Sequence, residues 1–142
     1  MILLVQAAAT LFMTGLIWFV QVVHYPLYGR VGREEFVGYE NEHAALTTLV
    51  VAPVMLVELL AAAWLVVDCP EPVPRWTTWL GAGLVAIIWA STAFLQVPAH
   101  SALSLGYQPE AHARLVSTNW IRTAAWTARS ALCLWMMSRF FR

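Results

Sequence analysis

The sequence contains no lysine, and charged residues of any kind are scarce. Of its 142 residues only 11% are charged, and eight arginines balance eight acidic residues to a formal net charge of zero. A soluble domain usually carries about 25% charged residues, so this chain has too little charge to cover a surface that faces water. It also lacks a basic stripe, which excludes nucleic acid as an expected partner.

Cysteine is nearly absent, and glycine forms no phosphate-binding loop. Cys69 and Cys133 show no metal-ligand spacing, so we interpret them as a loop thiol and a buried thiol. The sequence has no internal repeat and no low-complexity tract. The length of the chain predicts a single domain over residues 1–142.

Long apolar runs are what the chain does contain. Hydrophobic residues make up 61% of it, and its mean hydropathy is +0.67. A helix needs about 20 apolar residues to cross the hydrocarbon core of a bilayer. The first run has no basic residue before it and is too long for a signal peptide, so we expect it to be a mature helix. We predict transmembrane helices over residues 2–23, 44–67, 76–97 and 113–137.

These four helices predict an all-α integral membrane four-helix bundle with up-down topology and both termini on one side. Pro26 is expected to end the first helix. The segment EEFVGYENEH at 34–43 predicts a short interfacial helix that runs into the second span. The fourth helix has the lowest hydropathy and is expected to insert only by packing against the others. Its arginines are Arg114, Arg122 and Arg129.

Arginines flank both membrane faces about equally, so the positive-inside rule gives no clear orientation. Arg75, Arg139 and Arg142 fall on the side of the termini, and a similar number fall on the other side. The exposed pair at the C-terminus favours cytoplasmic termini, in what we expect to be a bacterial cytoplasmic membrane.

Polar residues recur at helical spacing in every predicted span, and in lipid such residues turn towards the bundle interior. Glu58 and Arg129 fall at similar depths, about 22 and 25 Å from one face at 1.5 Å per residue. A lone charge at that depth is costly, so we predict that they pair. A structural ion pair explains both residues, and a proton or ligand path through the bundle is the alternative.

All four histidines are predicted at the same membrane face, where helices begin or end. Imidazole is the commonest metal ligand and also an axial ligand of haem. Glu40 lies three residues before His43 and shares its helix face. We predict a first-row transition metal or a haem there, and the alternative is interfacial histidines that bond to backbone, headgroups or water. The candidate ligands are His24, Glu40, His43, His100 and His112.

Short motifs mark the ends of the first and third helices and the interior of the fourth: HYP at 24–26, VPAHSAL at 97–103, NWIRT at 119–123 and WTAR at 126–129. Together they resemble the anthrone-oxygenase-like family of small four-helix membrane proteins, over most of the chain. The resemblance implies a four-helix bundle and, in some members, cofactor-poor oxidation of a polyketide anthrone. It points to His100, Trp126 and Arg129.

Two functions of different classes follow. The first is a membrane oxidoreductase that acts on a lipophilic substrate, in which Arg122 and Asn119 stabilise an anionic substrate or intermediate. The second is a non-catalytic accessory subunit of a larger membrane complex, or a lipid- or quinone-binding protein. Helix faces such as 61–64 would then dock other membrane subunits or a second copy. A transporter or channel ranks last, because four helices make a thin wall for a pore.

Overall fold

The computed structural model describes residues 1–141, which form four long helical rods; Arg142 lies outside the described residues. The first rod consists of α1 (Ile2–Phe19), a π-helical turn η1 (Val20–His24), α2 (Tyr25–Leu27) and a 3₁₀ turn η2 (Tyr28–Arg30). The second is α3 (Phe36–Val67). The third consists of α4 (Arg75–Ser91), a second π-helical turn η3 (Thr92–Gln96) and α5 (Val97–Leu103). The fourth is α6 (Pro109–Ser138), which ends in the 3₁₀ turn η4 (Arg139–Phe141).

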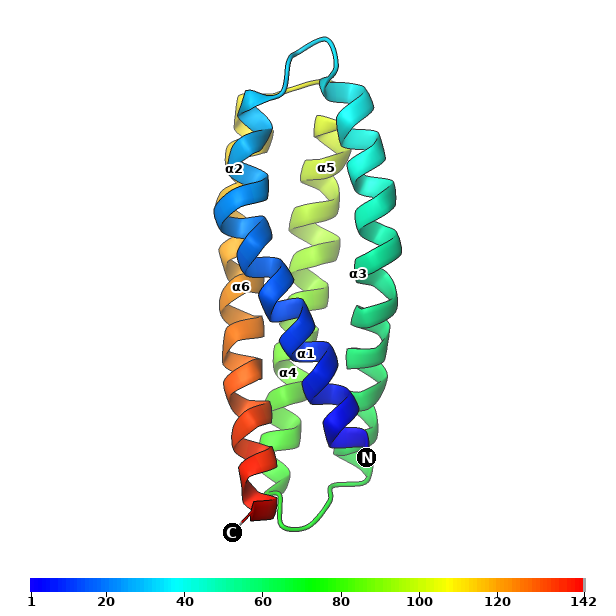
Figure 1. Cartoon of the computed structure of the whole chain (residues 1–142), viewed down its shortest axis with the longest axis vertical. Helices are drawn as coiled ribbons and strands as arrows, with labels where there is room; N and C mark the ends of the chain where they lie inside the picture. Colours follow the sequence, from blue (N-terminus) through cyan, green and yellow to red (C-terminus); the bar gives the residue numbers. More distant parts are fainter. Residues whose placement is uncertain (142) are drawn as a thin grey trace.

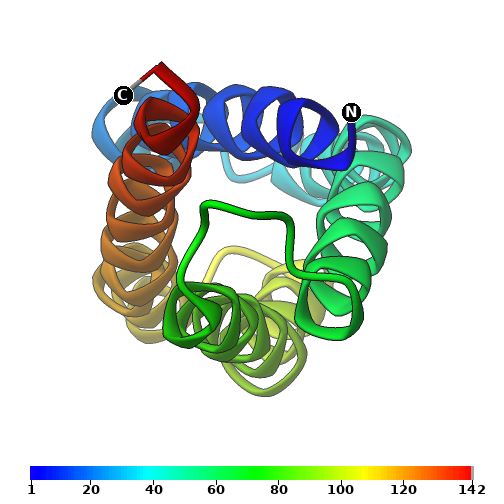
Figure 2. The same cartoon turned by 90° about the horizontal axis from the view of Figure 1, so that it is seen from below.

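The rods form a four-sided bundle, seen end-on in Figure 2. α1 packs against α3 and α6, and α4 packs against the same two helices on the other side. Both termini and the connection 68–74 lie at one end (Figure 1), which we call the lower end. The connections 31–35 and 104–108 lie at the upper end.

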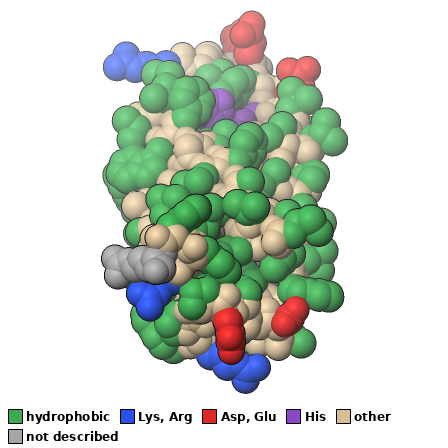
Figure 3. Space-filling view, turned by 60° about the horizontal axis from the view of Figure 1, so that its bottom comes forward, with side chains coloured by type: hydrophobic (Ala, Val, Ile, Leu, Met, Phe, Trp, Pro, Cys, Tyr) green, Lys and Arg blue, Asp and Glu red, His purple; other side chains and the backbone are tan. Residues whose placement is uncertain are grey.

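Three of the rods are long and apolar enough to cross a membrane: Ile2–Arg30, Phe36–Val67 and Arg75–Leu103. Figure 3 shows a surface that is largely hydrophobic along its length, with charged side chains at its ends. Such a surface is suited to lipid contact, because in water it would expose extensive apolar patches. α6 falls outside this group, as its arginines lower its hydropathy.

Two predicted helix ends are wrong, because proline terminates neither rod. The first rod continues past Pro26 to Arg30, and the third continues past Pro98 to Leu103. In an α-helix the proline ring clashes with the carbonyl four residues earlier. Here that carbonyl belongs to residue 22 or 94, and each lies inside a π-helical turn, where the wider winding gives the ring room. The rods are therefore distorted at these points and not broken.

The second and fourth rods also begin earlier than predicted. α3 starts at Phe36, so most of the segment predicted to run into the second span forms the first turns of α3 itself. α6 starts at Pro109, a residue well suited to the first helical position because it needs no N–H partner there.

A buried polar cluster joins all four rods in the lower half of the bundle. Glu58 of α3 accepts hydrogen bonds from Arg129 Nε at 3.1 Å and Thr10 Oγ1 at 2.5 Å through one oxygen. Its other oxygen accepts from Trp126 Nε1 at 2.8 Å. Arg129 also donates from Nη1 to the carbonyl of Gly81 in α4 at 2.6 Å. The two residues predicted to pair thus hold α1, α3, α4 and α6 together.

Candidate functional site

A cavity of about 490 Å³ occupies the upper half of the bundle and is lined by all four rods. Its volume lies within the range of about 300–1,000 Å³ typical of small-molecule sites. Apolar side chains line much of it, including Met13, Ile17, Val20, Met55 and Trp89. Its polar lining includes Tyr25, Glu40, His43, His100 and Arg122.

The cavity opens sideways between α3 and α5. Four of its lining residues are exposed on the outer surface, two on each rod: Asn41, Thr48, Val97 and Ser101. The cavity therefore reaches the outer surface between two of the rods that are long and apolar enough to cross a membrane.

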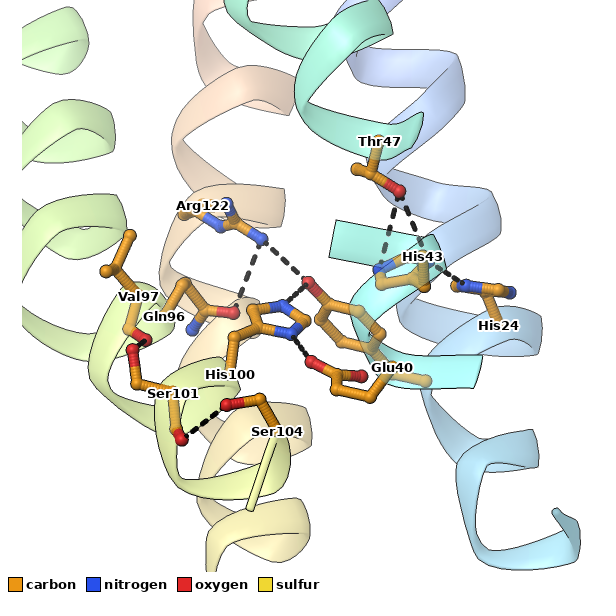
Figure 4. A network of polar contacts seen from close by, with 11 residues as sticks. His24, Glu40, His43, Thr47, Gln96, Val97, His100, Ser101, Ser104 and Arg122 are labelled. Carbon is orange, nitrogen blue, oxygen red and sulfur yellow. Dashed lines mark hydrogen bonds and ion pairs between the residues drawn. The ribbon is translucent and has the colours of Figure 1, made fainter. Parts of the chain in front are cut away.

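A chain of three side chains runs along the polar wall of the cavity (Figure 4). Glu40 is fully buried and lies 2.5 Å from His100 Nδ1, and His100 Nε2 lies 2.9 Å from the hydroxyl of Tyr25. In the arrangement with an ionised Glu40, which can only accept, Nδ1 carries the proton and Nε2 accepts from the tyrosine hydroxyl. This order of acid, imidazole and hydroxyl is the arrangement that activates a hydroxyl group towards proton loss.

Arg122 lies beside this chain and has no carboxylate of its own. Its guanidinium donates to Asn119 Oδ1 at 2.9 and 2.6 Å, to Gln96 Oε1 at 3.3 Å and to the Tyr25 hydroxyl at 3.4 Å. Within residues 1–141 Arg129 has an ion-pair partner and Arg122 has none. A buried cation surrounded by neutral oxygens is costly, and this one lines the cavity, so the site is suited to an anionic ligand or intermediate.

Asn119 does not line the cavity, although sequence analysis grouped it with Arg122. It is fully buried, donates to Gln21 Oε1 at 2.8 Å and accepts from Arg122 at two nitrogens. Asn119 therefore holds the guanidinium in place and is out of reach of a ligand.

Tyr25 is the site residue that the sequence did not reveal. Only 3% of its surface is exposed. It directly follows the π-helical turn η1, and Gln96 closes the corresponding turn η3. Such turns are frequent at functional sites, since they redirect side chains out of regular helical order. The available signal was Pro26, because a proline within a long helix predicts a distorted turn ahead of it.

His24 and His43 form a second pair at the cavity. His24 Nε2 lies 2.9 Å from His43 Nδ1, and the Thr47 hydroxyl lies 3.2 Å from the same His43 nitrogen. His43 lines the cavity, with its ring centre 5.6 Å from that of His100, and His24 lies behind it. The His24–His43 pair and the Glu40–His100 pair therefore both lie at the same cavity.

His112 belongs to a different group. Its Nε2 donates to the backbone carbonyl of Tyr25 at 2.7 Å, and its Nδ1 lies 3.1 Å from the hydroxyl of Tyr107. It does not line the cavity. The four predicted histidines thus share one end of the bundle, but only His43 and His100 line the cavity, and His24 reaches it only through its contact with His43.

The donor arrangement does not fit the predicted protein-held metal ion. Across the described part of the chain, no three His, Cys, Asp or Glu side chains are grouped so that they could hold a metal ion. Both ring nitrogens of His100 and of His112 already have protein partners.

No family model, curated protein or solved structure matches this chain. The resemblance to the anthrone-oxygenase-like family stays a prediction based on short motifs. Of the residues that the resemblance marks, His100 and Trp126 line the cavity. Arg129 does not line it, but it donates to the same Glu58 carboxylate as Trp126 does. The chemistry of the cavity is the firmer basis for a function.

Proposed function

We propose that this protein is a membrane oxidoreductase that removes a proton from a lipophilic aromatic ketone, after which dioxygen oxidises the enolate. The observation that carries the proposal is the Glu40–His100–Tyr25 chain beside Arg122, on an apolar cavity open towards lipid. Proton abstraction next to a carbonyl requires a positioned base and a donor for the new oxyanion. The site has both.

The proposed first step begins at Tyr25. Its hydroxyl proton passes to His100, whose imidazolium is stabilised by Glu40, and Arg122 stabilises the tyrosinate. The tyrosinate removes one hydrogen from the methylene carbon of the substrate as a proton. The electron pair of the broken C–H bond moves to the ketone oxygen, and this enolate oxygen accepts hydrogen bonds from Arg122.

The substrate class agrees with the resemblance seen in the sequence. An anthrone is a flat, lipophilic ketone with an acidic methylene group, so it combines an apolar body with a single polar edge. The cavity has the same division, with apolar residues such as Met13 and Trp89 and a polar wall at His100 and Arg122. The proposal needs no bound metal.

The membrane arrangement is part of the proposal. The four rods cross the bilayer in up-down alternation, and α6 is held in the lipid by its ion pair with α3. The first turns of α3, including Glu40 and His43, then lie near one interface, so the polar wall is close to headgroup depth and the apolar wall is deeper. The pair of arginines at the C-terminal end of the sequence favours cytoplasmic termini.

Deuterium exchange tests the proposed chemistry directly. The protein in lipid nanodiscs is mixed with anthrone in deuterium oxide without oxygen, and mass spectrometry follows the methylene hydrogens. We expect exchange at least about 100-fold faster than in empty nanodiscs, and formation of anthraquinone when air is admitted.

Two results would redirect the interpretation. Anthrone that binds tightly but does not exchange would contradict the enzyme and favour the alternative, a lipid- or quinone-binding protein. An optical spectrum and elemental analysis of the same preparation would detect a haem or a stoichiometric metal, either of which would contradict the metal-free route.

A further inference from the structure

The second histidine pair has no task in the first step. The relay of Glu40, His100 and Tyr25 is complete without it, yet His43 lines the same cavity. The ring centre of His43 lies 6.4 Å from that of Tyr25 and 5.6 Å from that of His100. A group bonded to the reacting carbon near Tyr25 is therefore within reach of His43.

The His24–His43 pair is surrounded by aromatic rings and can pass a proton between its two members. His24 contacts the ring of Tyr28 edge-on at 5.4 Å and lies 6.4 Å from Tyr39. Glu40 is bound to His100, and no acidic residue in the described chain forms an ion pair with His24 or His43. The shared contact at 2.9 Å lets one proton move between His24 and His43.

Oxidation of a methylene group to a ketone needs a second proton transfer. In the first half of the reaction, the methylene carbon loses one proton to Tyr25. The enolate carbon then bonds to dioxygen, which takes up two electrons. Tyr25 returns the proton to the outer oxygen, and the product is a hydroperoxide. In the second half, the remaining C–H proton leaves, its electron pair forms the new C=O bond, and the O–O bond breaks. The departing hydroxide requires a proton to leave as water.

We infer that His43, positioned by His24, is a second catalytic acid–base residue, which protonates the oxygen that leaves as the hydroperoxide collapses to the ketone. This inference rests on the proposed function. Over both halves one methylene group and one dioxygen give one ketone and one water, so no other reductant is consumed. The Tyr25–His100 relay takes up the second C–H proton and His43 gives one proton to the leaving oxygen, so the protein neither gains nor loses a proton in this step.

The test separates the two halves with His43→Gln and His24→Gln in nanodiscs supplied with anthrone. Anaerobic deuterium exchange reports the first half, and the ratio of hydroperoxide to anthraquinone in air, measured by mass spectrometry, reports the second. We expect both variants to retain exchange, while anthraquinone formation falls about 10- to 100-fold and the hydroperoxide accumulates. His112→Gln, a histidine outside the cavity, is the matched control and should resemble wild type in both readouts.

Each other outcome is decisive. Normal anthraquinone formation without hydroperoxide in His43→Gln overturns the inference and leaves the proposed function intact. Loss of exchange in both variants, when both are folded, would assign the His24–His43 pair to the first half of the reaction, and it would also overturn the inference. Absence of exchange in the wild-type protein overturns the proposed function and this inference with it. His24→Gln supplies the test if His43→Gln does not fold, with circular dichroism as the check.

Discussion

Replacing Glu58 with alanine is expected to destabilise the bundle by about 3–5 kcal/mol, the usual effect of leaving a buried charge without its partner. Arg129 would keep only the carbonyl of Gly81 as an acceptor, and Thr10 and Trp126 would lose theirs. Since this cluster is shared by all four rods, the loss is not confined to one helix. Thermal or SDS-induced unfolding in detergent micelles, followed by circular dichroism, measures it.

Two further variants give this experiment its controls. Trp126→Phe removes one hydrogen bond to the carboxylate but keeps the ion pair, so it should lose only about 1.5–3 kcal/mol. The double change Glu58→Leu with Arg129→Leu removes both charges together and should recover much of the stability lost in Glu58→Ala. If Glu58→Ala unfolds no more readily than Trp126→Phe, the ion pair does not have the structural role given to it here.

Tyr25→Phe is expected to slow anthrone exchange by about 100-fold or more. The change removes a single oxygen, which lies between His100 Nε2 and Arg122 Nη2. It leaves the buried ring in place, so folding should change little. The exchange assay in nanodiscs, with the melting curve recorded alongside, measures the effect.

Tyr107→Phe is the matched control for this prediction. Its hydroxyl also lies against a histidine, at 3.1 Å from His112 Nδ1, but it does not line the cavity. We expect exchange at the wild-type rate. Full activity in Tyr25→Phe together with loss of activity in His100→Gln would show that the imidazole itself is the base, and would contradict the relay through the hydroxyl.

The sequence supports prediction of the rods and of their inward charges, because both depend on local properties. Hydropathy alone locates the apolar cores of three of the rods, and depth along the helix axis is enough to match Glu58 with Arg129. Arg122 is also predictable as an inward residue, since lipid forces a guanidinium on α6 towards the interior.

The pairing of groups across the bundle is not predictable in the same way. Spacing placed Glu40 and His43 on one face of a helix, which is correct, but it cannot show that Glu40 bonds to His100 on another rod. That contact depends on how far each helix is rotated about its axis. His112 illustrates the same limit, because it shares the upper end with the other histidines but points to the carbonyl of Tyr25.

The two π-helical turns also set a constraint on chain length. Such a turn holds one residue more than α-helical winding would place there, and one residue corresponds to about 100° of rotation. In the first and third rods, the extra residue therefore rotates the residues that line the cavity about the helix axis, relative to the residues at the depth of the Glu58–Arg129 ion pair. Deleting one residue from 20–24 would restore regular α-helical winding. The two parts of the rod would then be rotated relative to each other, so Thr10 could no longer face Glu58 while Tyr25 faces the cavity. Point substitutions in these segments are consequently easier for the fold to absorb than a change of a single residue in length.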